Sequence, residues 1–263
     1  MSEFLDARLE KSVFRRTIPS LYRRMGQFFY GNKLIAERYG FKFLLDQSNL
    51  IDKGMLYRFG WEGSKYAQFL DYWRASSIGK QETVFLDVGA HWGLYAIRAS
   101  GEANISRIHA FEPDPRNKAQ LAANLFLNDL VDRIEVIDHA VSDEDGEITL
   151  SLAPLHNRGT SKIVDATNAT TDTKTVSVLC EKLDSRFQDR DCSFLIKMDV
   201  EGVELRALKG MQTLLTSNKV ILMVEANSGL AAVRDYLENL GFTYASVLKG
   251  NKGEDDHLFS NVG

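Results

Sequence analysis

Acidic side chains recur where predicted strands of this sequence end, a pattern that indicates a binding site for a small ligand. The first lies within TVFLDVGAHWG, residues 83–93, where an apolar run leads into Gly89 and Gly93. Such a run predicts a buried strand followed by a turn, and the apolar spacing after Trp92 predicts a helix. A strand, a turn and a helix in this order bring unpaired backbone amides close to a ligand.

The residues of this turn favour one class of cofactor over another. A dinucleotide site uses the spacing G-x-G-x-x-G, whereas here the middle glycine is missing and bulky residues occupy the turn. Asp87 would repel a diphosphate and attract the ammonium and sulfonium groups of S-adenosylmethionine. The residues expected to bind that cofactor are Asp87, Gly89, His91, Trp92 and Gly93. A nicotinamide-dependent oxidoreductase is the alternative.

The ends of the next two predicted strands carry further polar side chains. Glu112, followed by Asp114, ends the second strand, where an acidic residue can accept hydrogen bonds from ribose hydroxyls. Asp138, His139 and Ala140 follow at the third strand end, where the adenine edge would lie. We expect all of these residues to contact the cofactor, with an ordinary acidic turn as the alternative for the last three.

Asp199 and Glu201 alternate at the end of the segment LIKMDVEG, so both side chains can face the same ligand. Either carboxylate can remove a proton from an acceptor hydroxyl, or hold a divalent cation such as Mg²⁺ that acidifies it. His139 is a third candidate base, because imidazole titrates near neutrality. Glu225 ends a later strand and is predicted to contact the substrate. The structural alternative for these carboxylates is to cap the helices that follow them.

Strands and helices alternate from residue 83 onward, and this order predicts how the acidic side chains come together. The predicted strands after the first are 107–113, 134–141, 193–200 and 220–226, and the predicted helices are 115–130, 203–215 and 230–240. This alternation implies a parallel sheet with helices on both faces, which binds ligands outside the carboxyl ends of its strands. The segments 242–248 and 257–262, joined by GNKGEDD, predict an antiparallel pair at one edge.

Two regions interrupt this alternation and suggest a division of the chain. Residues 1–80 are predicted to be an elaboration that packs on the core, with a basic helical segment, strands at 42–46 and 55–61, and a helix at 64–73. Residues 81–263 are predicted to be the catalytic domain that binds the cofactor. Within it, a polar insertion near 151–175 predicts a mobile loop beside the site, with a plain surface excursion as the alternative.

The composition limits the class of protein. The 263 residues are 44% hydrophobic and 26% charged, enough for a full core, and the net charge of -4 gives no sign of a nucleic-acid partner. Cys180 and Cys192 lack the spacing of a zinc site or a disulfide framework. No apolar run approaches the roughly 18 residues of a transmembrane helix, and no signal peptide is evident. We expect a cytoplasmic protein that acts on a small molecule or a glycan.

Four segments in the right order resemble the FkbM-type methyltransferases, a branch of the class I enzymes that use S-adenosylmethionine. They are DVGAHWGLYAIRAS, HAFEPDPRNKAQLAAN, HAVSDEDGEITL and FLIKMDVEGVELRALKGM, and the last narrows the resemblance to this family. The likeness covers residues 41–262 and implies a Rossmann-like α/β fold with a seven-stranded, mostly parallel sheet whose last strand is antiparallel. His91 and Trp92 depart from the family pattern, which more often has Asn and a small or aliphatic residue.

The resemblance also implies an activity, the transfer of a methyl group to a hydroxyl of a sugar, a polysaccharide or a polyketide-like molecule. Asn157, Gly159 and Ser161 match an N-x-G-x-S stretch of the family, and their polar groups are predicted to contact that acceptor. A scaffold that keeps the fold without turnover is the alternative. The carboxylates at the first, second and fourth strand ends weigh against it.

Overall fold

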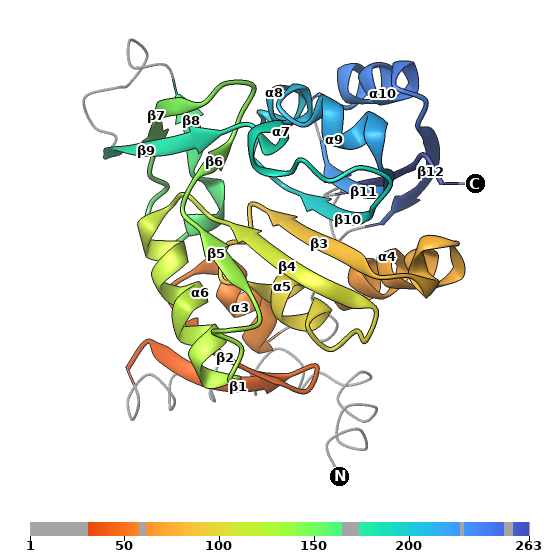
Figure 1. The fold of residues 1–263 in the computed structure, drawn as a ribbon. Helices are drawn as coiled ribbons and strands as arrows, with labels where there is room; N and C mark the ends of the chain where they lie inside the picture. The colour runs from red at the N-terminus through yellow and green to blue at the C-terminus, as the bar shows by residue number, and fades with distance from the viewer. Residues whose placement is uncertain (1–30, 58–61, 165–173, 227–228, 250–254, 263) are drawn as a thin grey trace.

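A seven-stranded sheet forms the centre of the computed structural model, which describes residues 31–57, 62–164, 174–226, 229–249 and 255–262 (Figure 1). The strand order is β12-β13-β11-β10-β3-β4-β5. The strands are β3 (Thr83–Val88), β4 (Ile105–Phe111), β5 (Glu135–Ile137), β10 (Ser193–Met198), β11 (Lys219–Glu225), β12 (Thr243–Leu248) and β13 (Asp256–Ser260). β13 is antiparallel to both neighbours and the other pairs are parallel, which confirms the predicted sheet. Most of the turn between β12 and β13, residues 250–254, lies outside the described residues.

The apolar residues of the sheet alternate between two hydrophobic cores, because successive side chains of a strand point to opposite faces. Phe85 and Leu195 belong to one core with side chains of α4, α5 and α6, whereas Leu86 and Ile196 belong to the other with those of α7 to α10. These helices are α4 (Gly63–Ala75), α5 (Leu94–Ala99), α6 (Pro115–Leu127), α7 (Leu183–Arg186), α8 (Glu204–Lys209), α9 (Gln212–Ser217) and α10 (Leu230–Asn239). Helices therefore cover both faces, as predicted.

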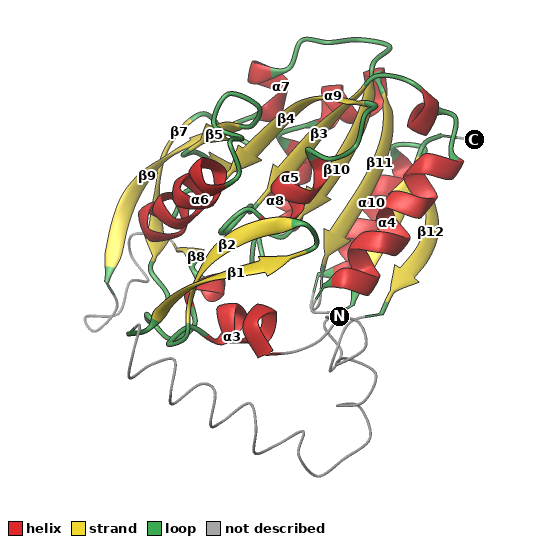
Figure 2. Ribbon diagram, turned by 90° about the horizontal axis from the view of Figure 1, so that it is seen from below, coloured by secondary structure: helices red, strands yellow, loops and turns green. Residues whose placement is uncertain are grey.

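The residues before the sheet place a hairpin and a helix over the face that carries α5 and α6 (Figure 2). The elements of this region are β1 (Lys33–Arg38), β2 (Phe41–Asp46), α3 (Leu50–Tyr57) and, after α4, the 3-10 helix η1 (Ile78–Lys80). Leu44 N donates to Oδ1 of Asn124 on α6 at 2.7 Å, and the Phe43 ring lies edge-on to Trp92 with centroids 5.3 Å apart. The predicted basic segment lies within residues 1–30, outside the described part, and the division at residue 80 stays a prediction.

The strand predicted at 55–61 is wrong as far as it is described, because residues 55–57 end α3. Asn49 begins this helix: its Oδ1 accepts hydrogen bonds from Ile51 N at 2.9 Å and Asp52 N at 3.3 Å. These bonds satisfy amides that a helix start leaves without partners. Asn49 is a residue type that often begins a helix, but the large apolar residues of 55–61 favoured the prediction of a strand.

The strand predicted at 134–141 is also corrected, since the chain divides there into two strands of different sheets. β5 pairs with β4 in the main sheet, whereas β6 (Ala140–Val141) pairs with β9 (Thr175–Glu181). β9 belongs to a second sheet of order β6-β9-β7-β8, which includes β7 (Gly146–Ser151) and β8 (Lys162–Val164). β6 thus pairs with a strand of the second sheet and not with β4. Asp138 and His139 lie between β5 and β6, where the chain passes from one sheet to the other.

The polar insertion is partly ordered where a mobile loop was predicted. Its described residues include the 3-10 helix η2 (Arg158–Thr160) and β8, and the Arg158 side chain is buried. Residues 165–173 lie outside the described part. Across the ranges that are described, no helix is both long and apolar enough to cross a membrane.

Candidate active site

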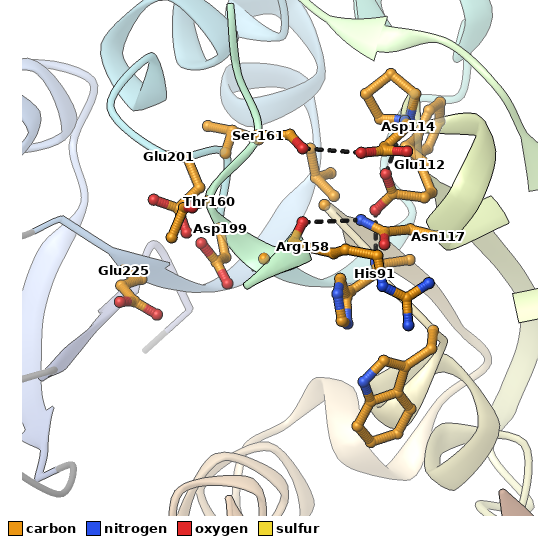
Figure 3. A pocket seen from close by; sticks show the side chains of 18 of the residues that line it. His91, Glu112, Asp114, Asn117, Arg158, Thr160, Ser161, Asp199, Glu201 and Glu225 are labelled. Carbon is orange, nitrogen blue, oxygen red and sulfur yellow. Dashed lines mark hydrogen bonds between the residues drawn. The ribbon is translucent and has the colours of Figure 1, made fainter. Parts of the chain in front are cut away.

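A cavity of about 530 Å³ opens at the carboxyl ends of β3, β4, β10 and β11, where ligands of such sheets bind. The predicted site residues that line it are Gly89, His91, Trp92, Glu112, Asp114, His139, Ala140, Asn157, Gly159, Ser161, Asp199, Glu201 and Glu225. Asp87, Gly93 and Asp138 do not line it. Figure 3 shows two groups of side chains in this cavity, with Glu112, Asp114 and Asn117 on one side and Asp199, Glu201 and Glu225 on the other. We call them the cofactor end and the acceptor end.

The two glycines of the turn serve the packing of the protein itself. Gly89 has φ +80°, and a Cβ there would lie 1.8 Å from the carbonyl oxygen of Asp199. Gly93 has φ +90°, and a Cβ there would lie 2.3 Å from Cδ1 of Leu121 on α6. Glycine accepts both the conformation and the close approach. The turn therefore packs against Asp199 and α6, while Gly89 also lines the cavity.

Asp87 faces a cation of the protein, and this corrects the expectation that its side chain meets the ligand. One carboxylate oxygen accepts a hydrogen bond from Ala96 N at 2.9 Å, and the other lies 3.9 Å from Nζ of Lys197. The group is buried, which raises its pKa, while the nearby ammonium opposes that shift. Asp87 thus fixes the start of α5 and the position of Lys197.

Glu112 lies at the cofactor end, where hydrogen bonds from two backbone amides hold its carboxylate in place. His91 N donates to Oε2 at 2.7 Å and Asp114 N donates to Oε1 at 2.8 Å. Burial raises the pKa of Glu112 to about 7 despite these bonds. Asp114 caps α6 by accepting from Arg116 N at 2.9 Å, and it pairs with the Arg116 guanidinium at 2.6 Å. The carboxylate predicted to hold a ribose is therefore held in place before any ligand binds.

Several buried polar atoms beside Glu112 have no hydrogen-bond partner among the described groups. They are Nε2 of His91, Nε1 of Trp92 and Oδ1 of Asn117, and all three residues line the cavity. Burial lowers the pKa of His91 to about 3, so its imidazole is neutral. Unpaired buried polar atoms are costly and indicate groups that a ligand or water satisfies. Donors and acceptors of this kind fit a nucleoside with hydroxyl and ring-nitrogen groups.

His139 lies on the cofactor side of the cavity, between β5 and β6. Its Nδ1 is 3.4 Å from Oε2 of Glu181. Three strand spacings, about 14 Å in all, separate β5 from β10, the strands that precede His139 and Asp199. Asp138 points to the surface, where its carboxylate accepts a hydrogen bond from Lys118 at 2.8 Å, and its side chain does not reach the cavity.

The acceptor end gathers carboxylates from the ends of two neighbouring strands, β10 and β11. Asp199 is held by its backbone, whose N–H donates to the Val88 carbonyl at 2.9 Å, and its Oδ2 lies 3.4 Å from Nζ of Lys197. Burial first, and then Asp199, raise the pKa of Glu201 to about 7 and that of Glu225 to about 8. These groups therefore titrate near neutrality, in the range that suits a general acid or base.

Other residues occupy the N-cap positions of the helices that follow these carboxylates. α8 begins at Glu204 with Val203 at its N-cap, and α10 begins at Leu230 with Gly229 at its N-cap. Neither helix has a side-chain hydrogen bond at its cap. The N-cap role considered for Asp199 is therefore wrong, and Asp199, Glu201 and Glu225 all line the cavity.

Residues from distant parts of the chain complete the acceptor end, and the sequence predicted none of them as site residues. Nζ of Lys65, on α4, lies 3.1 Å from Asp256 of β13 and 3.6 Å from Glu62. The Tyr95 hydroxyl donates to Oε2 of Glu62 at 2.9 Å. Lys197 could have been predicted from the sequence, because it lies on β10 two residues before Asp199, at the alternation that places both side chains on one face. The others had no local signal, since α4 and β13 meet only in the fold.

The N-x-G-x-S stretch lies against the cofactor end. Ser161 Oγ donates to Asp114 at 2.8 Å, and Asn117 Nδ2 donates to the Arg158 carbonyl at 3.3 Å. The Arg158 guanidinium reaches into the core, where it donates to Gln120 at 2.6 Å and lies 3.6 Å from Asp52. A buried arginine that sequence reasoning overlooked therefore anchors this stretch. Among the residues that the structure describes, no group of three or more His, Cys, Asp and Glu side chains is arranged to hold a metal ion.

Known proteins with similar sequences are methyltransferases. The hexuronic acid methyltransferase AglP of Haloferax volcanii is 28% identical over 177 residues, which cover 67% of this chain and 70% of AglP. The 2-O-methyltransferase NoeI of Sinorhizobium fredii is 27% identical over 201 residues and covers 68% of this chain and 80% of NoeI.

Solved structures show the same fold at low identity. The methyltransferase FkbM of Methylobacillus flagellatus matches with a TM-score of 0.51 and 19% identity, over 68% of this chain and 43% of that chain. The human methyltransferase 10 domain containing protein matches with a TM-score of 0.50 and 15% identity, over 94% of this chain and 96% of that one. The fold is thus that of class I methyltransferases. The model of the methyltransferase FkbM domain matches residues 87–244, more than half of the chain, and the protein therefore belongs to the FkbM methyltransferase family.

Proposed function

We propose that this protein transfers a methyl group from S-adenosylmethionine to a hydroxyl of a sugar or polysaccharide. Family membership supports the reaction class, and the names of the two relatives, a hexuronic acid methyltransferase and a 2-O-methyltransferase, support a hydroxyl of a sugar. One observation carries the proposal. A single cavity joins a preorganised carboxylate, Glu112, to a second group that contains Asp199 and two acids with raised pKa values, Glu201 and Glu225. The oxidoreductase and scaffold alternatives have no comparable support.

The residues of the cofactor end fit the cofactor of this family. Glu112, fixed by the amides of His91 and Asp114, would accept hydrogen bonds from the ribose hydroxyls. The unpaired atoms of Asn117 and Trp92 would complete the polar contacts of the nucleoside. The bound cofactor supplies an electrophilic methyl group, and the electron pair of the broken carbon–sulfur bond leaves with the sulfur.

Asp199 is our candidate for the residue that takes the proton of the acceptor hydroxyl. The acceptor oxygen forms the new bond to carbon, and its proton passes to the Asp199 carboxylate, so the charges balance. Nζ of Lys197 lies 3.4 Å from Oδ2 of that carboxylate and fixes its position beside the acceptor. The backbone of Asp199 also lies against Gly89 of the turn, and both residues line the cavity. His139 follows β5, which lies three strand positions from β10 in the sheet, and this favours Asp199 over His139 as the base.

Glu201 and Glu225 would assist at the same end by accepting hydrogen bonds from further hydroxyls of the acceptor. With pKa values of about 7 and about 8, each exists in both protonation states near neutral pH. Each can therefore donate to or accept from a polyhydroxylated ligand. A divalent cation held by Asp199 and Glu201 is the other role to be tested.

The experiment that tests the proposal combines binding with transfer. Calorimetric titration with S-adenosylhomocysteine should give saturable binding, and isotopically labelled S-adenosylmethionine should label a glycan fraction. The matched titration uses NAD at the same concentrations. Saturable NAD binding without S-adenosylhomocysteine binding would overturn the proposal, and so would S-adenosylhomocysteine binding with label found only in non-carbohydrate acceptors.

A further inference from the structure

The acceptor end carries more negative than positive charge among its described residues. Nζ of Lys65 lies 3.1 Å from Asp256 and 3.6 Å from Glu62, and Nζ of Lys197 lies 3.4 Å from Asp199 and 3.9 Å from Asp87. Each ammonium is thus shared by two carboxylates, which leaves two negative charges in this set. The carboxyl groups of Glu201 and Glu225, which also line the cavity, are not included in this count.

The described cations that line the cavity are engaged by groups of the protein. They are Lys65, Lys197 and Arg158, and the last points away from the acceptor end toward Gln120 and Asp52. Although burial opposes it, Asp199 and Asp87 raise the pKa of the Lys197 ammonium. An acceptor carboxylate that pairs with Lys65, Lys197 or Arg158 would therefore have to displace an existing buried partner, which is costly, whereas the exposed Lys162 lies outside the cavity lining.

The carboxylates of the acceptor end also raise one another's pKa values. Burial raises the pKa of Asp256 to about 6, and the neighbouring Lys65 only partly offsets this shift. Asp199 contributes to the raised pKa values of both Asp256 and Glu201. Because like charges in a partly desolvated site repel strongly, a further negative charge is disfavoured here. Hydroxyl groups suit the same carboxylates, since an ionised carboxylate is an acceptor only.

We infer that the sugar unit that receives the methyl group carries no negative charge, so that neutral sugars and amino sugars are accepted and uronic acids are rejected. The inference rests on the proposed function and makes it more specific. The acceptor sugar of this protein would then differ from that of its relative in Haloferax volcanii, which is named a hexuronic acid methyltransferase.

The test compares matched acceptors with the full chain and labelled S-adenosylmethionine. Suitable sets are 4-nitrophenyl hexosides, deoxyhexosides and hexosaminides, each hexoside with its uronide and the methyl ester of that uronide. We expect kcat/KM for the uronide to be at least about tenfold lower than for the hexoside, equivalent to about 1.4 kcal/mol. The neutral methyl ester should recover most of this loss, and added salt should narrow the gap.

The possible failures are distinguishable. A uronide that is methylated as well as or better than its hexoside would overturn the inference and leave the proposed function standing. Labelling of no sugar of any charge, by protein that still binds S-adenosylhomocysteine, would overturn both.

Two variants test whether the carboxylates of Glu62 and Asp256 cause the preference for hexoside over uronide. Glu62→Gln and Asp256→Asn each remove one negative charge from the acceptor end, so each should reduce the preference for hexoside over uronide by about threefold, or about 0.65 kcal/mol. Two variants are used because Asp256 is buried and its substitution risks the fold, whereas Glu62 is partly exposed. Asp132→Asn, an exposed residue that does not line the cavity, is the matched control and should leave the ratio unchanged. Unchanged ratios in folded forms of both variants would contradict the inference.

Discussion

The cofactor end and the acceptor end of the cavity are built in different ways. Glu112 and Asp114 are held by backbone amides and by Arg116, groups supplied by two neighbouring strand ends and the helix that follows. Lys65 and Asp256 are held by each other, across elements far apart in the sequence. The first arrangement is local and fixed in advance, whereas the second depends on the balance of charge. The difference suggests that cofactor affinity tolerates changes to the acceptor end, and the following experiments test this separation.

The largest effect should come from Asp199→Asn, because Asn keeps the size of Asp but cannot take the proton. Loss of a general base typically lowers turnover by about 100- to 10,000-fold. The affinity for S-adenosylhomocysteine should change by less than about twofold, equivalent to about 0.4 kcal/mol. Steady-state turnover and calorimetry measure the two quantities, and Asp132→Asn is the control. An Asp199→Asn enzyme with full turnover would exclude Asp199 as the base.

Removal of divalent cations distinguishes two ways in which Asp199 can act. If Asp199 takes the proton directly, EDTA should leave the turnover of the wild-type protein unchanged. Inhibition by EDTA that Mg²⁺ reverses would instead favour a cation held by Asp199 and Glu201. Turnover after dialysis, with and without added Mg²⁺, is the measurement.

Glu112→Ala should produce the next largest effect, and on binding alone. Loss of charged hydrogen bonds to the ribose should weaken S-adenosylhomocysteine binding by about 1 to 3 kcal/mol. Turnover at saturating cofactor should fall much less, because the acceptor end stays intact. Glu82→Ala removes an exposed acid outside the cavity and serves as the control. Unchanged affinity in Glu112→Ala would contradict the assignment of the cofactor end.

Ser161→Ala should have a smaller effect on cofactor binding. The hydroxyl donates to Asp114 and accepts from Ala153 N at 3.1 Å, so its loss loosens the insertion over the cofactor end. We expect a loss of about 0.5 to 1.5 kcal/mol in S-adenosylhomocysteine affinity. Ser177→Ala, at an exposed position of β9, is the matched control. If only the KM for the acceptor changed, the original expectation that this stretch binds the acceptor would be supported instead.

The smallest effect concerns stability and pH. Burial raises the pKa of Glu201 to about 7 from its usual 4.5, so the folded protein holds this proton more tightly than the unfolded chain does. The contribution to the free energy of unfolding is therefore full below pH 4.5, falls as the pH rises through 7, and is lost above that. Glu201→Gln should reduce the loss of stability between pH 5 and pH 8 by about 1 kcal/mol, allowing for solvent screening. Denaturant unfolding at both pH values measures this, and an unchanged pH dependence would contradict it.

The amino-acid sequence by itself determined the main sheet and the cofactor end. Runs such as 83–88 and 193–198 are buried at every residue, and each is followed by a helix, which leaves little choice but a parallel sheet covered on both faces. The carboxyl ends of neighbouring parallel strands meet at one edge. Glu112 and Asp199 could therefore be predicted to share a cavity without any knowledge of distant contacts.

Only the tertiary structure decided the direction of single side chains and the partners that come from distant elements. Asp87 was predicted to face the ligand but pairs with Lys197, and the strand predicted at 134–141 divides because β9 offers Ala140 a second partner. Lys65 reaches Asp256 only when α4 packs beside β13. Hydrophobic periodicity and turn residues act over a few positions, whereas ion pairs and strand pairing form between any segments that folding brings together. The acceptor end depends on contacts of the second kind.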